Sequence, residues 1–268
     1  MDIQTSAHVG ELLRQWRQRR RLSQLDLACE AEISTRHLSF LETGRSRPSR
    51  EMLLRLAEWL DVPLRERNTM LLAAGYAPVF PERPLADPSM EAARRTIQRV
   101  LTGHEPYPAL AVDRHWTLVM HNAAVPLFLA GVEDASLLEP PVNVLRLSLH
   151  PKGLAPRIAN LGQWRAHLLA RLHRQIEVSG DAVLAALLEE LRAYPLAGGS
   201  AEAEHDFAGI AVPLQFVTPA GTLSFISTTT VFGTPVDLTL AELALETFFP
   251  ADEASAEALR RLSFKEEK

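Results

Sequence analysis

The first quarter of the chain repeats apolar residues at helical spacing, separated by short polar turns. In its first segment, Leu12, Leu13 and Trp16 fall on one side of a helix, and arginines lie around the rest. The pattern predicts three further short helices, whose inward-facing residues are expected to be Leu27 and Ala28, Leu38 and Leu41, and Met52, Leu53, Leu56 and Leu60. The spacing therefore favours a small, purely helical domain over residues 1–76.

Capping residues mark where these helices begin and end. Ser23 precedes the second helix (24–30), and Asp26 stands three positions later, in the place of a capping-box acid. Ser34 is placed to cap the third helix, and Gly44 follows that helix as a residue that adopts positive φ at little cost. Caps this closely spaced leave only a tight turn between the second and third helices.

The pattern changes after residue 76. Prolines at positions 78, 81, 84 and 88 predict a linker or a wrapping arm over residues 77–90. The remaining segments are predicted as a helix over 90–102, strands over 109–112 and 116–120, a short helix from Asn122, helices through 142–194, two or three antiparallel strands over 209–233 with a hairpin turn at 219–221, and closing helices over 239–262. Strands, then helices, then strands again predict an α+β domain of PAS type over 91–268.

Composition and charge narrow the classes of function. The chain is 47% hydrophobic and 23% charged, which is typical of a soluble globular protein. It has no apolar run of the roughly 20 residues that span a bilayer, and its start lacks the order of a signal peptide. One cysteine, Cys29, fits a reducing cytoplasm and is expected in the core. Residues 1–76 hold 12 basic against 10 acidic residues, while the remainder holds 16 against 23, so the first half is the one suited to a polyanion.

The segment LSQLDLACEAEISTRHLSFLETGRSRPSREMLLRLAEWLDV (residues 22–62) resembles the helix-turn-helix of the phage-repressor (XRE) family of transcription regulators. One residue departs from that pattern, because Glu32 occupies the turn position where the family prefers glycine. A non-glycine residue there is strained by up to about 1 kcal/mol. The resemblance implies a domain that places its third helix in the major groove of DNA.

The same resemblance implies roles for individual residues. The residues that would read base edges are Ser34, Thr35, Arg36 and Ser39, with His37 at the boundary of that surface. Gln24 would bond phosphate and brace the third helix. Arg45 and Arg47 would bind the phosphate backbone of the DNA. Phe40 would either touch a thymine methyl or pack against a neighbouring helix. The alternative for the whole surface is a solvated arginine face on a protein-binding helical bundle.

The second half resembles the ligand-binding domain of MmyB-like regulators, through WTLVMHNAAV, NVLRLSLHPKGL, GDAVLAALLEEL and FGTPVDLTLAELALETFFPAD. This resemblance implies a PAS-like sensor that can hold a fatty-acid-like molecule. The candidate cavity residues are Trp116, Leu118, Met120, Trp164, Phe216 and Phe225, which can equally fill a core. Arg146 and His150 share a helix face and are candidates to grip a carboxylate, or else are an ion-paired arginine and a helix-ending histidine. Asn122 is a candidate ligand contact that can instead cap a helix.

The function predicted is a ligand-responsive, DNA-binding transcription regulator that acts as a homodimer on an inverted repeat. An enzyme is the rival class, but the nine histidines lack a metal-ligand spacing, and neither a phosphate-binding glycine loop nor a serine elbow is present. We therefore expect no catalytic residues, no metal and no cofactor. The remaining alternative is a DNA-binding regulator controlled by a protein partner, like an antitoxin, with no small-molecule ligand.

Overall fold

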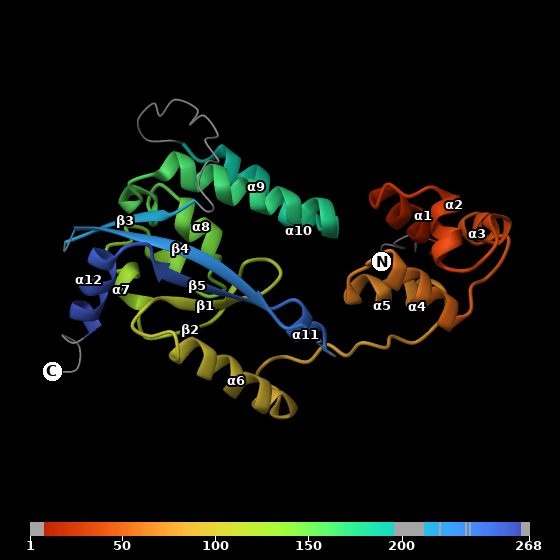
Figure 1. The fold of residues 1–268 in the computed structure, drawn as a ribbon, viewed down its shortest axis with the longest axis horizontal. Helices are drawn as coiled ribbons and strands as arrows, with labels where there is room; N and C mark the ends of the chain where they lie inside the picture. The colour runs from red at the N-terminus through yellow and green to blue at the C-terminus, as the bar shows by residue number, and fades with distance from the viewer. Residues whose placement is uncertain (1–7, 196–211, 220, 234, 236, 264–268) are drawn as a thin grey trace. The chain divides into compact units, whose positions relative to one another are not determined.

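The computed structural model describes residues 8–195, 212–219, 221–233, 235 and 237–263, and the chain divides into two compact units (Figure 1). The first unit comprises Met1–Arg83 together with Pro235–Ala241, and the second comprises Pro84–Thr234 together with Glu242–Lys268. Among the described residues no helix is both long and apolar enough to cross a membrane.

The first unit is helical, as the hydrophobic pattern predicts. Its helices are α1 (Val9–Arg19), α2 (Gln24–Glu30), α3 (Thr35–Glu42), α4 (Arg50–Trp59), α5 (Leu64–Ala73) and the short α11 (Leu238–Ala241). The core contains the apolar residues expected from the sequence, including Leu13, Trp16, Leu27, Leu38, Leu41, Leu53, Leu56 and Leu60. Cys29 is an exception to the prediction, because it lies on the outer face of α2 and is exposed.

The predicted caps are confirmed. The hydroxyl of Ser23 accepts from the backbone of Asp26 at 3.1 Å, and the Asp26 carboxylate accepts in return from the Ser23 backbone at 2.8 Å. Ser34 caps α3 through the backbone N–H of His37. The two predicted special positions also have left-handed backbone, with φ of 54° at Glu32 and 73° at Gly44. Glu32 therefore tolerates the turn conformation that glycine adopts more easily.

The second unit is built on a five-stranded antiparallel sheet in the order β2-β1-β5-β4-β3. The strands are β1 (Ala109–Val112), β2 (Leu118–His121), β3 (Leu214–Thr218), β4 (Gly221–Val231) and β5 (Ala244–Pro250). The helices are α6 (Glu91–Thr102), α7 (Pro126–Leu129), α8 (Val144–Leu149), α9 (Leu161–Ser179), α10 (Ala182–Ala193) and α12 (Glu253–Ser263), with short 3₁₀ turns at Pro88–Met90, Ala135–Leu138 and Ala155–Arg157. The α+β class predicted for this unit is confirmed.

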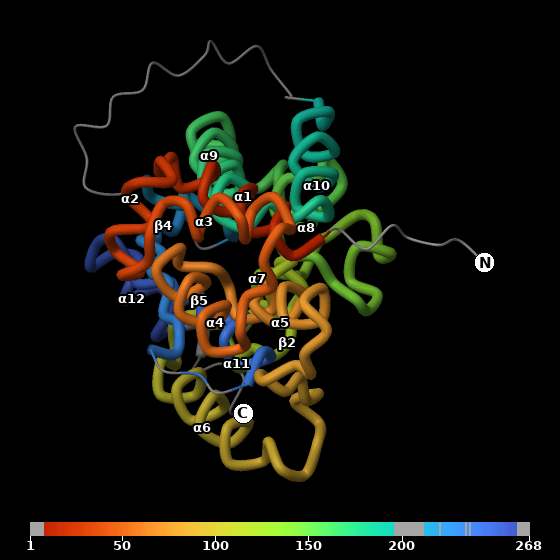
Figure 2. Tube along the Cα trace, turned by 90° about the vertical axis from the view of Figure 1, so that its right-hand side faces the viewer, coloured from red at the N-terminus to blue at the C-terminus, as the bar shows by residue number. Residues whose placement is uncertain are grey.

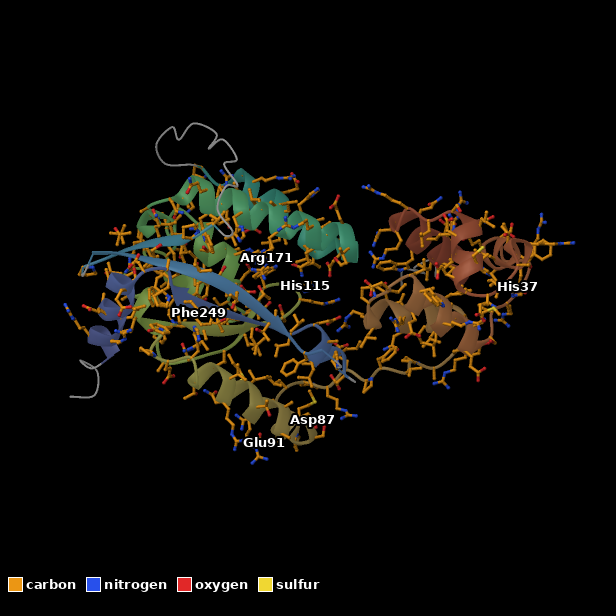
Figure 3. The ribbon with its side chains drawn as sticks, in the orientation of Figure 1. His37, Asp87, Glu91, His115, Arg171 and Phe249 are labelled. Carbon is orange, nitrogen blue, oxygen red and sulfur yellow. The ribbon has the colours of Figure 1, made fainter. Side chains whose placement is uncertain are left out.

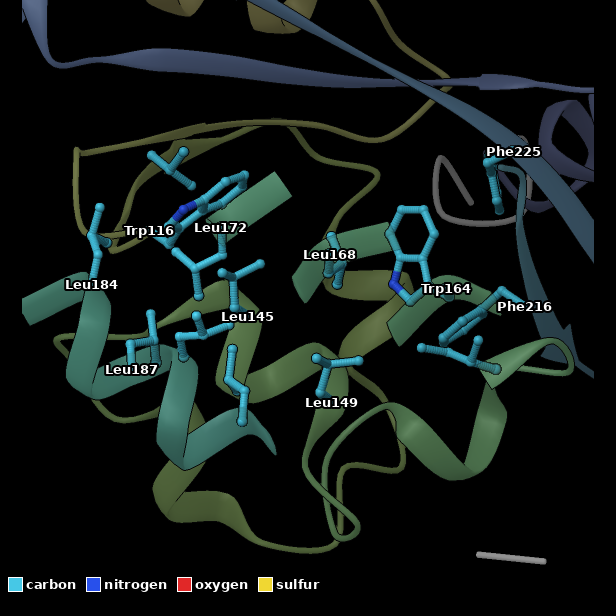
Figure 4. Close-up of a cluster of buried hydrophobic side chains, with 14 of the residues drawn as sticks. Trp116, Leu145, Leu149, Trp164, Leu168, Leu172, Leu184, Leu187, Phe216 and Phe225 are labelled. Atoms are coloured by element: carbon cyan, nitrogen blue, oxygen red, sulfur yellow. The ribbon is translucent and has the colours of Figure 1, made fainter. Parts of the chain in front are cut away.

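The helices cover the sheet from two sides. Helices α9 and α10 lie on one side of the sheet, and α6 lies on the other and packs against β1 and β2 (Figures 1 and 2). The buried side chains that face α9 form the main core of this unit. Figure 4 shows Trp116 and Trp164 in that core, with Leu168 and Leu172 of α9 between them.

The prediction of closing helices over 239–262 is wrong in part. Residues Ala244–Pro250 form β5, which pairs with β1 on one side and β4 on the other, so it is a central strand of the sheet. Its first residues, Ala244, Leu245 and Glu246, suit a helix, whereas Thr247, Phe248 and Phe249 suit a strand, and pairing on both edges satisfies the backbone groups of the strand. The predicted helix over 253–262 is present as α12.

The short helix predicted from Asn122 begins later than predicted. Asn122 is buried, and its side chain bonds backbone groups on three segments: it accepts from Ala109 at 3.1 Å and donates to Leu101 at 3.2 Å and Tyr107 at 2.7 Å. The next helix, α7, begins only at Pro126. Asn122 therefore ties the end of α6 to β1 and is neither a helix cap nor a ligand contact.

Candidate nucleic-acid interface and ligand cavity

Helix α3 presents the side chains that the sequence proposes for base reading. Ser34 and Arg36 are exposed, whereas Thr35, Ser39 and His37 (labelled in Figure 3) are half-buried beside the outer face of the helix. The opposite face carries Leu38 and Leu41, which are buried in the core. The N-terminal end of α3 therefore offers two hydroxyls, a guanidinium and an imidazole to a partner.

A buried polar cluster fixes α3 against α1 and α2. Glu42, at the end of α3, accepts from Arg17 Nε at 2.6 Å and from Arg17 Nη2 at 2.9 Å. The amide of Gln24, the first residue of α2, donates to the same carboxylate at 2.8 Å. The hydrogen bond that Arg17 donates to Glu42 also raises the pKa of Arg17 above its ordinary value. Gln24 thus braces the third helix as the sequence predicts, while its contact with phosphate stays a prediction.

Gly10 allows α1 to approach the end of α3 closely. A Cβ atom at Gly10 would lie 2.3 Å from the carbonyl oxygen of Leu41 and 2.7 Å from that of Glu42. Both are backbone atoms, so no side-chain rotation could make room. The glycine is therefore required for the packing that positions α3.

Phe40 lies between two of the candidate DNA-binding arginines. Its half-buried ring is 5.3 Å from the Arg36 guanidinium and 5.8 Å from that of Arg45. Cation–π contacts of this kind hold long side chains in place without consuming their hydrogen-bond donors. Arg45 and Arg47 are exposed in the turn after Gly44, where the Arg45 backbone N–H bonds to the carbonyl of Phe40 at 2.8 Å. The arrangement gives α3 and the following turn a set of oriented cationic groups.

The second unit contains a mostly apolar cavity of about 390 Å³ between the sheet and helices α7, α8 and α9. Trp116, Trp164, Phe216 and Phe225, all proposed from the sequence, line it. Leu118, also proposed from the sequence, lines it too, and the further apolar lining includes Leu110, Phe128, Leu145, Leu168 and Phe248. A volume of this size suits a small organic molecule.

An ion pair contributes to the polar part of the cavity lining. Arg171 of α9 (Figure 3) donates to Glu246 of β5 through Nη1 at 3.0 Å and through Nη2 at 2.6 Å. Thr229 of β4 bridges them, since it accepts from Arg171 Nη2 at 2.6 Å and donates to Glu246 at 2.9 Å. The Arg171 guanidinium also lies 4.5 Å from the ring of Trp116. The side chains of Arg171 and Glu246 are only 23% and 5% exposed.

The two residues proposed to grip a carboxylate, Arg146 and His150, lie outside the cavity. Arg146 is on the outer face of α8, opposite Leu145 and Leu149, and is bonded in bidentate fashion to Glu190 of α10, with both Nε–Oε1 and Nη2–Oε2 at 2.8 Å. Arg146 thereby lowers the pKa of Glu190. His150 ends α8 with its ring 5.1 Å from that of Tyr194.

The carboxylate grip proposed for Arg146 and His150 is therefore corrected. The arginine already holds a carboxylate of the protein, and the histidine terminates its helix, as the alternative interpretation of the sequence has it. Met120 is corrected as well. It is half-buried on β2, an edge strand, and it is not among the cavity-lining residues, although Leu118 and His121 of that strand are.

Sequence reasoning missed Arg171 and Glu246. A signal for Arg171 is present, because it follows Trp164 and Leu168 at helical spacing on the face of α9 that lines the cavity. Glu246 carried no such signal, since its strand was predicted as a helix and its partner lies 75 positions away. Within the described residues no cluster of histidine, cysteine, aspartate or glutamate is suited to a metal ion.

The α11 segment (residues 237–241) lies between β4 and β5 in the sequence but packs within the first unit. The backbone N–H of Leu238 donates to the carbonyl of Pro81 at 2.9 Å, and the hydroxyl of Thr239 donates to that of Arg83 at 2.6 Å. Asp237 and Leu238 are 2% and 3% exposed, and α11 contacts α5. The part of the predicted linker up to Arg83 is thus held in the helical unit.

Comparison with known protein families agrees with both halves of this structure. Residues 8–70 match a helix-turn-helix domain family, and residues 93–262 match the family described as MmyB-like transcription regulator ligand binding domain. No curated protein matches the chain. The second match covers more than half of the chain and contains the sheet, the cavity and the ion pair. The chain therefore belongs to the MmyB-like regulators, and it is a DNA-binding transcription regulator with a helix-turn-helix domain and an MmyB-like ligand-binding domain.

Proposed function

We propose that this regulator binds a small, mostly apolar ligand of fatty-acid-like character in the cavity of its second unit, and that occupancy of the cavity changes its affinity for an operator. The observation that carries the proposal is the cavity itself, with its lining of tryptophan, phenylalanine and leucine side chains. Each methylene group buried there contributes about 0.8 kcal/mol, so an acyl chain is a suitable occupant.

The α11 segment supports a link between ligand and operator binding. The chain leaves the sheet at the end of β4, is anchored in the helical unit by Leu238 and Thr239, and returns to the sheet as β5. Glu246, which lines the cavity, and Thr229, which donates to it, lie on these same two strands and pair with each other in register. A ligand that displaces this strand pair thereby acts on a segment fixed to the DNA-binding unit.

For the DNA-binding unit, we propose that Arg36 reads a base edge and that Arg45 and Arg47 hold phosphates. The exposure of these arginines and the contacts of Phe40 with Arg36 and Arg45 support this division. One helix reads only a few base pairs, so we propose that a homodimer binds an inverted repeat. We further propose that the protein acts in the cytoplasm and has no enzymatic activity of its own.

Footprinting of the DNA upstream of its own gene tests the DNA-binding part. We expect one protected inverted repeat, with two protein chains per site by light scattering of the complex. Native mass spectrometry of the purified protein tests the ligand part, and an acyl-chain molecule is the expected occupant. If no molecule co-purifies and no member of an acyl series raises the melting temperature, control by a protein partner becomes the better explanation.

A further inference from the structure

The ion pair in the cavity limits which ligand head group can enter. Arg171 and Glu246 carry opposite charges and hold each other through two hydrogen bonds, so together they add no net charge to the cavity lining. The remaining lining is mostly apolar, with Ser148, Ser227 and His121 as its other polar side chains. A ligand therefore meets a polar site that is already electrically neutral.

The pair still has hydrogen-bonding capacity for a ligand. In the part of the chain that the structure describes, Glu246 and Thr229 engage three of the five guanidinium N–H groups of Arg171. The carboxylate of Glu246 accepts three hydrogen bonds, of about four that it can accept. Both a donor and an acceptor are thus left for a group that approaches the pair.

The charge of the ligand's head group decides which ligands can use this donor and acceptor. A carboxylate anion would accept from Arg171, but it would place a second negative charge beside the Glu246 carboxylate, whose side chain is only 5% exposed. A neutral amide or hydroxyl accepts from Arg171 and donates to Glu246, so it satisfies both groups and adds no charge.

We propose that the Arg171–Glu246 pair is a specificity element that selects acyl-chain ligands with a neutral, hydrogen-bonding head, such as a primary amide, over the corresponding carboxylates. The inference rests on the proposed function, since it assigns the head group of the ligand in the same cavity. It names Glu246 as the residue that rejects the anion and Arg171 as the residue that binds the ligand's carbonyl oxygen.

Calorimetric titration of the full chain, freed of bound lipid, with decanamide and with decanoate at pH 8 tests the proposal. We expect the amide to bind about tenfold or more tightly than the acid, because a site built around paired polar groups penalises a ligand that leaves an unbalanced charge. Equal affinities, or tighter binding of decanoate, would overturn the proposal. This wild-type ratio does not depend on any variant folding.

Glu246→Gln supplies the sharper test. Glutamine keeps an acceptor for Arg171 but removes the negative charge, so the preference should shift toward decanoate by about tenfold or more. Glu190→Gln is the matched control, because Glu190 also holds an arginine in bidentate fashion but lies outside the cavity. The control should leave the ratio unchanged. If Glu246→Gln melts like the wild type and the ratio does not move, Glu246 is not the selecting residue. If neither ligand binds at any concentration, the ligand proposal itself fails and this inference falls with it.

Discussion

Removal of Arg17 should destabilise the helix-turn-helix and displace its third helix. Arg17 is the cationic partner of Glu42, and the two side chains are only 11% and 2% exposed. Arg17→Met keeps the aliphatic length of the side chain but removes the guanidinium, so the Glu42 carboxylate stays buried without its counter-charge. The perturbation therefore separates the ion pair from the packing around it.

The expected magnitude follows from this burial. Breaking one partner of a buried ion pair costs about 3–5 kcal/mol. Gln24 still donates to Glu42 at 2.8 Å, which places the loss near the lower limit, about 3 kcal/mol. For a domain of about 60–100 residues each kcal/mol lowers the melting temperature by about 4–8 °C, so the unit should melt more than about 10 °C earlier. Replacing both partners, in Arg17→Met with Glu42→Leu, should recover most of the loss because no buried charge remains.

Hydrogen exchange measured by mass spectrometry on peptides from residues 9–60 isolates the stability of this unit from that of the second. The single variant should lose protection in α1 and α3 together, and the double variant should regain it. A loss below about 1 kcal/mol in the single variant, or a double variant as unstable as the single one, would refute the reasoning.

Three further predictions concern the same unit. Arg36→Ala should weaken binding to cognate DNA by about 1–3 kcal/mol and relax the preference at one base pair. Arg45→Ala should weaken binding to all DNA sequences alike and reduce the slope of log affinity against log salt by about one. Equal loss of sequence preference in gel shifts of both variants would contradict the assignment. Gly10→Ala should destabilise the unit by about 1–3 kcal/mol and abolish operator binding, because its Cβ would meet backbone oxygens of α3. Gly233→Ala, in the other unit, is the control: its Cβ would meet no atom within 4 Å, so operator binding should stay intact. The hydrogen bonds from the hydroxyl and the backbone of Ser23 lower the pKa of Asp26. The ionised carboxylate therefore stabilises α2 fully above the ordinary pKa of aspartate, and this stabilisation is lost as the pH falls through the lowered pKa of Asp26. Amide exchange of α2 followed from about pH 5 to pH 2 should show the loss, and Asp26→Asn should make the exchange less dependent on pH.

The features that the sequence predicted well are local ones. The capping box of Ser23 and Asp26, the positive φ of Gly44 and the apolar faces of the first four helices depend on residues within a few positions of each other. The aromatic side chains of the cavity could also be proposed, because large apolar residues in an α+β domain must face its sheet or its core.

The features that could not be predicted from the sequence depend on contacts between residues far apart along the chain. Strand β5 combines the helix formers Ala244, Leu245 and Glu246 with the strand formers Thr247, Phe248 and Phe249, and its pairing with β1 and β4 decides the outcome. The same lack of long-range information explains the wrong head-group residue: Arg146 and Arg171 are both arginines near apolar helix faces, but one meets Glu190 outside the cavity and the other meets Glu246 in its lining. No local pattern distinguishes the two.

Whether cavity occupancy changes operator binding is tested most directly by fluorescence anisotropy with labelled operator, titrated with ligand-loaded and with ligand-free protein. Two coupled sites typically differ by about 5–150-fold in affinity, and we expect the two forms to differ within that range. Leu238→Ala, which loosens the α11 segment without touching the cavity lining, should shrink the difference while ligand affinity is retained. Identical operator affinities for the loaded and the ligand-free protein would contradict regulation through the cavity.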